Sequence, residues 1–111
     1  MRIGREFTAR LIPEGEGHFQ IEGEVVFATV MKLLEESREL FTDCEHIALD
    51  FAGVTRINTA GLGLVIEWLR WARHEGRALS ISHPPAALLS LARICEAEGI
   101  IAPALAAAEE A

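Results

Sequence analysis

Short apolar runs separated by turn-forming residues predict a pair of strands near the start of the chain. Residues 7–12 form the first run, and the Pro- and Gly-rich residues 13–17 predict the connection that follows it. Residues 18–22 alternate apolar and polar side chains, as a half-buried strand does, and Gly23 is expected to end this strand. These two strands are expected to pair in antiparallel fashion.

The apolar spacing then becomes helical, and a helix is predicted over residues 26–41. Residues 46–51 form a short, mostly apolar run that suits a strand covered on at least one face. Residues 52–58 are expected to be a loop, and a second helix is predicted over residues 59–74. The apolar stripe expected for the first helix consists of Phe27, Val30, Met31, Leu34 and Arg38, widened by Leu33, Leu40 and Phe41.

The last third of the chain continues the alternation of strands and helices. A strand is predicted over residues 79–82 and a helix over residues 86–98, which Gly99 is expected to end. Ile100-Ile101 could add one more short strand. Strands that alternate with helices imply parallel pairing through right-handed crossovers.

The element order is therefore β-β-α-β-α-β-α, which predicts an α/β fold with a mixed sheet of four to five strands. The length of 111 residues suits a single domain, 1–111. Its core is expected over residues 7–101, followed by an Ala- and Glu-rich tail over residues 102–111.

Composition narrows the range of partners. The net charge is −7 and no basic stripe is present, so nucleic acid is not an expected ligand. No stretch approaches the roughly 20 apolar residues of a membrane span, and the first six residues hold no apolar leader segment. We therefore expect a cytoplasmic protein without membrane insertion. Cys44 and Cys95 are expected to be buried, reduced thiols.

The segment around Thr59 carries the clearest chemical signal. A strand leads through a loop to a hydroxyl at the start of a helix, where free N–H groups and the positive end of the helix dipole favour an anion. Asn58 or Thr59 can cap this helix. Ala60 and Gly61 have minimal side chains, so the backbone of a partner could approach closely.

The helix over residues 59–74 has more apolar surface than a one-sided sheet requires. Beside its core stripe lies a second apolar stripe, Leu64, Trp68 and Trp71, which leaves only a narrow polar face that includes Gly63 and Glu67. The second stripe can pack on a neighbouring helix or can bind a partner, because Trp is common both in cores and at interfaces.

Enzymatic, metal and cofactor sites are not supported by the sequence. Gly61-Leu62-Gly63 lacks the third glycine of a dinucleotide fingerprint, since Ile66 stands there. Cys44 and His46 would share one side of an extended segment, but a zinc site needs further ligands. Thr59 has no adjacent His or Lys to activate it as a nucleophile. We expect neither catalytic residues, nor a metal site, nor a cofactor.

The segment 49–63 resembles the central motif of STAS domains, in which a strand ending in Asp leads through Gly and apolar residues to Asp-Ser/Thr-x-Gly-Leu. This family includes anti-sigma factor antagonists, sulfate-transporter tails and the MlaB subunit of a lipid ABC transporter. The chain continues to resemble the family through residues 67–70, Gly76 and residues 85–100. The matching residues of the motif are Asp50, Gly53, Val54, Ile57, Thr59, Gly61 and Leu62.

The resemblance implies a single STAS domain with its helices mainly on one face and a non-catalytic, protein-binding role. Thr59 takes the place of the Ser/Thr that is phosphorylated in the antagonists, and Thr-Ala-Gly-Leu at 59–62 is similar to MlaB. Asn58 replaces the usual Asp, which removes a charge that kinase sites in the family retain. The partner-binding residues are expected to be Asn58, Thr59, Ala60, Gly61, Gly63, Leu64, Glu67, Trp68 and Trp71.

Three functions remain open on this basis. The first is an MlaB-like accessory subunit that docks on the cytosolic ATPase of a phospholipid-transporting ABC system. The second is an anti-sigma factor antagonist that is switched when a kinase-like anti-sigma factor phosphorylates Thr59. The third is a nucleotide- or anion-binding domain that uses the helix start.

Overall fold

Four strands form a mixed sheet in the computed structural model, which describes residues 6–110. The strands β1 (Ala9–Gly15), β2 (His18–Val25), β3 (His46–Ile57) and β4 (Ala78–Ser82) lie in the order β1-β2-β3-β4. β1 and β2 are antiparallel, whereas β2, β3 and β4 are mutually parallel. The predicted mixed sheet and its strand directions are confirmed. Residues 1–5 and 111 of the expected domain lie outside the described residues.

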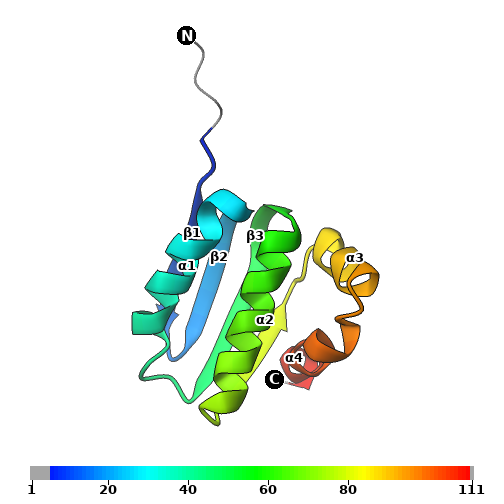
Figure 1. Cartoon of the computed structure of the whole chain (residues 1–111). Coiled ribbons are helices and arrows are strands. Elements are labelled where there is room, and N and C mark those ends of the chain that lie inside the picture. Colours follow the sequence, from blue (N-terminus) through cyan, green and yellow to red (C-terminus); the bar gives the residue numbers. More distant parts are fainter. Residues whose placement is uncertain (1–5, 111) are drawn as a thin grey trace.

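Two helices cover one face of this sheet, as expected (Figure 1). They are α1 (Phe27–Leu40), which follows β2, and α2 (Thr59–His74), which follows β3. The core lies between these helices and the sheet. Alternate strand residues point into it, and the most deeply buried include Ile21, Ile47, Leu49, Phe51 and Ile81.

The remaining helices, α3 (Ala86–Ile94) and α4 (Glu98–Glu110), follow β4. The expected helix over 86–98 is wrong in its end, because Glu96 adopts a left-handed conformation with φ of 57° and α3 stops before it. Gly99 and the expected strand Ile100-Ile101 belong instead to α4. Ile101 is buried, and α4 packs against β4. Residues 102–110, expected to be a tail, are therefore part of a packed helix.

Three strand boundaries also differ from the prediction. β1 begins at Ala9 and runs through the residues expected to form the turn as far as Gly15. β2 passes through Gly23, whose φ of 94° lets the strand continue past the close carbonyl of Thr8. β3 extends through the expected loop to Ile57, because this segment pairs with the end of β2. In β2 the register shifts at Gly23, because a glycine can form an irregularity within a strand without ending the strand.

The buried face of α1 agrees only in part with the prediction: Leu33 lies in the core and Val30 and Leu34 pack against it, but Phe27 and Met31 do not. Phe27 is 84% exposed and Met31 is 61% exposed, whereas Thr29, Leu33 and Ser37 are buried. The hydroxyl of Thr29 donates to the Glu24 carbonyl at 2.6 Å and accepts from the Val26 N–H at 3.1 Å. The Ser37 hydroxyl likewise donates to the Leu34 carbonyl. Because both hydroxyls are hydrogen-bonded, Thr29 and Ser37 can occupy the buried side of the helix. The buried side of α1 is therefore centred on Thr29, Leu33 and Ser37, and one edge of the expected stripe, Phe27 and Met31, faces outward.

The thiols also differ from the expectation. Cys95 is exposed at the end of α3, and Cys44 is half-buried. Both are free cysteines. The expectation of two buried thiols is therefore wrong for Cys95.

Candidate functional site

The candidate site lies at the edge of the sheet where parallel strands β2 and β3 end. Val25 and Ile57 are paired at these ends, and the N–H of Asn58 donates to the Val25 carbonyl at 3.4 Å. Each strand leads directly into its helix, so α1 and α2 begin at the same end of the molecule (Figure 1). The positive ends of two helix dipoles therefore lie at one edge.

Asn58 is the residue that caps α2. Its backbone is extended, and its side-chain Oδ1 accepts the N–H of Ala60 at 3.0 Å and that of Gly61 at 3.3 Å. These bonds satisfy two of the free N–H groups at the helix start. Of the two caps considered from the sequence, the structure identifies Asn58.

Thr59 is consequently the first residue of α2, and its side chain is exposed. Within residues 6–110 its hydroxyl makes no hydrogen bond, so it is open to a partner or a modifying enzyme. The sequence-based expectation of a hydroxyl presented at a helix start agrees with this geometry.

The two glycines that follow have different surroundings. A methyl group on Gly61 would lie 2.5 Å from the Val25 carbonyl oxygen and 2.5 Å from Cγ1 of Ile57. Gly61 is therefore small so that α2 can pack on the strand ends, and it is buried from any partner. A methyl group on Gly63 would meet nothing within 4 Å, and Gly63 is exposed. Of these two glycines, Gly63 and not Gly61 leaves room for the close approach that the sequence suggested for Ala60 and Gly61.

The second apolar stripe of α2 packs inside the molecule. Trp68 is 2% exposed, and its indole N–H donates to the Ser37 hydroxyl of α1 at 2.8 Å. Leu64 is also buried. Trp71 is half-buried, with its ring 5.9 Å from that of Phe41 and below the Arg77 guanidinium at 5.3 Å. In this conformation Leu64 and Trp68 are not accessible to a partner.

The expected partner-binding residues thus separate into three groups. Thr59, Gly63 and Glu67 are exposed, and Asn58, Ala60 and Trp71 are half-buried. The buried ones are Gly61, Leu64 and Trp68.

Two exposed residues at this end of the molecule were missed by the sequence analysis. Phe27 starts α1, and Met31 lies one turn later on the side opposite the buried stripe of that helix. Their apolar character had placed them in the expected core. The signal that could have identified them is the position of Thr29 and Ser37, which share the opposite side of the helix and can bury their hydroxyls against backbone carbonyls.

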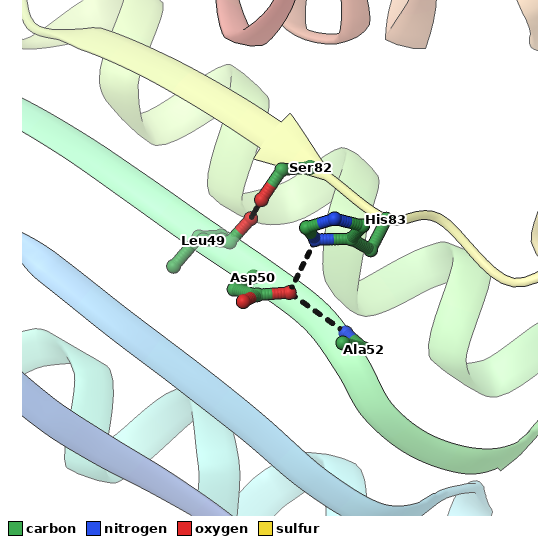
Figure 2. Close-up of polar contacts among 5 residues, drawn as sticks. All are labelled: Leu49, Asp50, Ala52, Ser82 and His83. Carbon is green, nitrogen blue, oxygen red and sulfur yellow. Dashed lines mark hydrogen bonds and ion pairs between the residues drawn. The ribbon is translucent and has the colours of Figure 1, made fainter.

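A second polar cluster fixes the end of β4 (Figure 2). The Asp50 carboxylate accepts the Ala52 N–H at 2.9 Å and lies 3.0 Å from Nδ1 of His83. His83 has a left-handed backbone with φ of 52°, and Pro84 and Pro85 separate it from the start of α3. The Ser82 hydroxyl donates to the Leu49 carbonyl at 3.4 Å. Asp50, a residue of the motif, therefore ties β3 to the turn that follows β4.

Residues 6–110 contain no cluster of three or more His, Cys, Asp or Glu side chains that could hold a metal ion. No helix among these residues is long and apolar enough to cross a membrane.

Comparison with known proteins gives consistent results. The model of the STAS domain family of MlaB matches residues 11–103. The fold is similar to that of the anti-sigma factor antagonist SpoIIAA in its unphosphorylated form, with a TM-score of 0.64 and 16% identity over 83% of this chain and 84% of that one. It is also similar to part of Mglu, with a TM-score of 0.55 and 22% identity over 69% of this chain and 20% of that one. No curated protein sequence matches significantly.

These findings agree on one family. The family match spans the sheet and the helices α1 to α3, and it includes the Asn58–Thr59 turn. The similarity to SpoIIAA independently supports the fold. STAS domains are generally non-catalytic regulatory modules that bind other proteins. The chain belongs to the MlaB-type STAS domain family.

Proposed function

We propose that this protein is a regulatory module that docks on a protein partner through the exposed start of α2 and the adjacent outer side of α1. The observation that carries the proposal is the exposed Thr59 hydroxyl, which has no hydrogen bond within residues 6–110 and lies at the capped start of a helix. We call the surface formed by Phe27, Met31, Asn58, Thr59 and Gly63 the docking surface.

The apolar part of this surface supports a protein partner over a small anion. Phe27 and Met31 are both large and mostly exposed, and neither contributes to the core of this chain. Aromatic residues and Met are enriched at the centres of protein interfaces. Gly63 has open space around it, which allows a partner to approach the α2 backbone closely.

The preferred partner is the cytosolic ATPase of a phospholipid-transporting ABC system. The family model carries the name of MlaB, and Thr59-Ala60-Gly61-Leu62 has the MlaB-like sequence. Asn58 is neutral and its side chain is already used to cap α2. The turn therefore lacks the acidic residue found at the kinase sites of the family, which favours constitutive docking over a phosphorylation switch.

Co-purification with the candidate ATPase tests this function. Thr59→Glu places a negative charge at the centre of the docking surface, and Phe27→Asp places one on its apolar part; both variants should lose the ATPase. Thr42→Glu is the matched control, since Thr42 is an exposed threonine beyond the opposite end of α1. Retention of the ATPase by both test variants would exclude the docking surface.

The second candidate is an anti-sigma factor antagonist, which the similarity to SpoIIAA and the exposed Thr59 hydroxyl favour. Incubation with ATP and a kinase-type anti-sigma factor should then produce phosphothreonine at position 59. Mass spectrometry should detect it in the natural chain and not in Thr59→Ala. Absence of phosphate from both proteins, with a kinase that is active on its own substrate, would leave the ATPase as the partner to pursue.

A further inference from the structure

A groove with an unusual lining lies between α2, β4 and α4, away from the docking surface. Its volume is about 700 Å³. Buried Leu79 and Ala104 lie at its base, and Ile66 and Ile100 line it from α2 and α4. Ile100 is 48% exposed, so apolar surface remains open to solvent here. The volume lies in the range of sites that hold one small ligand, roughly 300–1,000 Å³.

The charged residues of the groove are all of one sign. Arg70, Arg73 and Arg77 line it, and no Asp or Glu does, although the chain has 17 acidic against 10 basic residues. Every other lining residue is apolar or glycine. An apolar groove with cationic groups and no anionic ones is complementary to a molecule with an apolar body and an anionic head.

The three arginines are not equally engaged within the molecule. The Arg77 guanidinium donates to the carbonyls of Phe41 and Cys44, each at 3.0 Å, so it supports the end of α1. Among residues 6–110, the one interaction of the Arg70 guanidinium is a 3.9 Å ion pair with Glu67 on the exposed surface. Arg73 has no ion pair or hydrogen bond through its side chain within residues 6–110. Two guanidinium groups are therefore available to an external anion.

We propose that this groove binds a single-chain carboxylate amphiphile, such as a fatty acid. The hydrocarbon chain lies over Leu79 and between Ile66 and Ile100, and the carboxylate pairs with Arg73 and Arg70. A guanidinium fork matches a carboxylate in geometry and makes charge-assisted hydrogen bonds to it. The site is independent of the docking surface, because Thr59 starts α2 whereas Arg70 and Arg73 belong to its last two turns.

The test uses the full chain, labelled with ¹⁵N, and dodecanoate below its micelle concentration as the probe. Saturable shifts are expected at the amides of Leu79, Ala104 and Ala107. Dodecyltrimethylammonium, with the same chain and the opposite charge, and acetate, with the head and no chain, should not produce them. Equal binding of the cationic amphiphile would overturn the proposal, as would shifts confined to the Phe27 and Met31 surface.

Two pairs of variants locate the site. Arg73→Glu should weaken dodecanoate binding about tenfold or more, because it replaces a charge-assisted hydrogen bond to the carboxylate with repulsion, whereas Arg38→Glu on α1 should not. Ala107→Phe fills the groove and should abolish binding, whereas Ala106→Phe, an exposed neighbour outside the lining, should not. Unchanged affinity in both Arg73→Glu and Ala107→Phe, with the fold confirmed by circular dichroism, would also overturn the proposal.

Discussion

The indole N–H of Trp68 donates a 2.8 Å hydrogen bond to the hydroxyl of Ser37, and this bond joins α2 to α1 in the core. The Ser37 hydroxyl in turn donates to the Leu34 carbonyl at 2.7 Å. Both polar atoms are therefore satisfied although both residues are buried. The aromatic ring of Phe41 lies 5.7 Å from that of Trp68 and completes the contact. This contact joins the two helices to which we assign the proposed docking surface.

Removal of the Ser37 hydroxyl should destabilise the fold because the buried indole N–H of Trp68 loses its acceptor. Ser37→Ala leaves a buried indole N–H without an acceptor, which costs roughly 1–3 kcal/mol. In a Trp68→Phe background the same change should cost much less, because no donor remains. Urea unfolding of the four proteins measures this coupling. An equal cost of Ser37→Ala in both backgrounds would show that the bond contributes nothing.

Gly61 and Gly63 should respond in opposite ways to the addition of one methyl group. Gly61→Ala forces the methyl group against the Val25 carbonyl and should destabilise the fold by roughly 1–3 kcal/mol. Gly63→Ala meets open space inside a helix and should stabilise the fold by about 0.5–1 kcal/mol. Thermal unfolding distinguishes the two outcomes. A similar melting temperature for both variants would contradict the packing described for the start of α2.

The capping role of Asn58 gives a third prediction. Asn58→Ala removes the acceptor of two helix N–H groups and should cost about 0.5–2 kcal/mol. Asn58→Asp keeps the acceptor and adds a negative charge at the positive end of α2, so its stability at neutral pH should equal or exceed that of the natural chain. Chemical denaturation at pH 7 measures both. The prediction fails if Asp destabilises the helix start as much as Ala.

Phe27 and Met31 should contribute little to stability. Phe27→Ser and Met31→Ser should each change the free energy of unfolding by less than about 0.5 kcal/mol, as expected for exposed positions. Leu33→Ala, on the buried side of the same helix, should cost roughly 2–5 kcal/mol. Denaturation curves of the three variants provide the comparison. A large loss in Phe27→Ser would show that this ring packs within the chain and is not part of a docking surface.

The sequence predicts the bounds of α2 well because its determinants are local. A capping Asn58 stands directly before the helix, the apolar stripe follows the helical period, and Gly76 lies just beyond its end. The face of α1 could not be obtained in this way. Ser37 is buried together with its hydrogen-bond partner Trp68. Because Trp68 lies 31 residues away in the sequence, no local pattern reveals this pairing.

The candidate site was also predicted only in part, because some of its features depend on local sequence and others on contacts between distant segments. The exposed Thr59 hydroxyl and the cap follow from the strand-turn-helix pattern. Gly61 was expected to contact a partner but is buried against β2, and of the two possibilities left open for Trp68 the structure shows packing on α1. The exposure of Phe27 could not be predicted, because large apolar side chains are usually buried and tertiary packing overrides that tendency here.

Both outer strands of the sheet are obstructed. Along β1, Pro13 lacks a backbone N–H, and the exposed carboxylate of Glu14 follows it. At the other margin α4 packs against β4. An unobstructed outer strand is a template on which further chains can add. The fold therefore resists strand-to-strand aggregation, and a shortened chain that lacks α4 should be the form most prone to it.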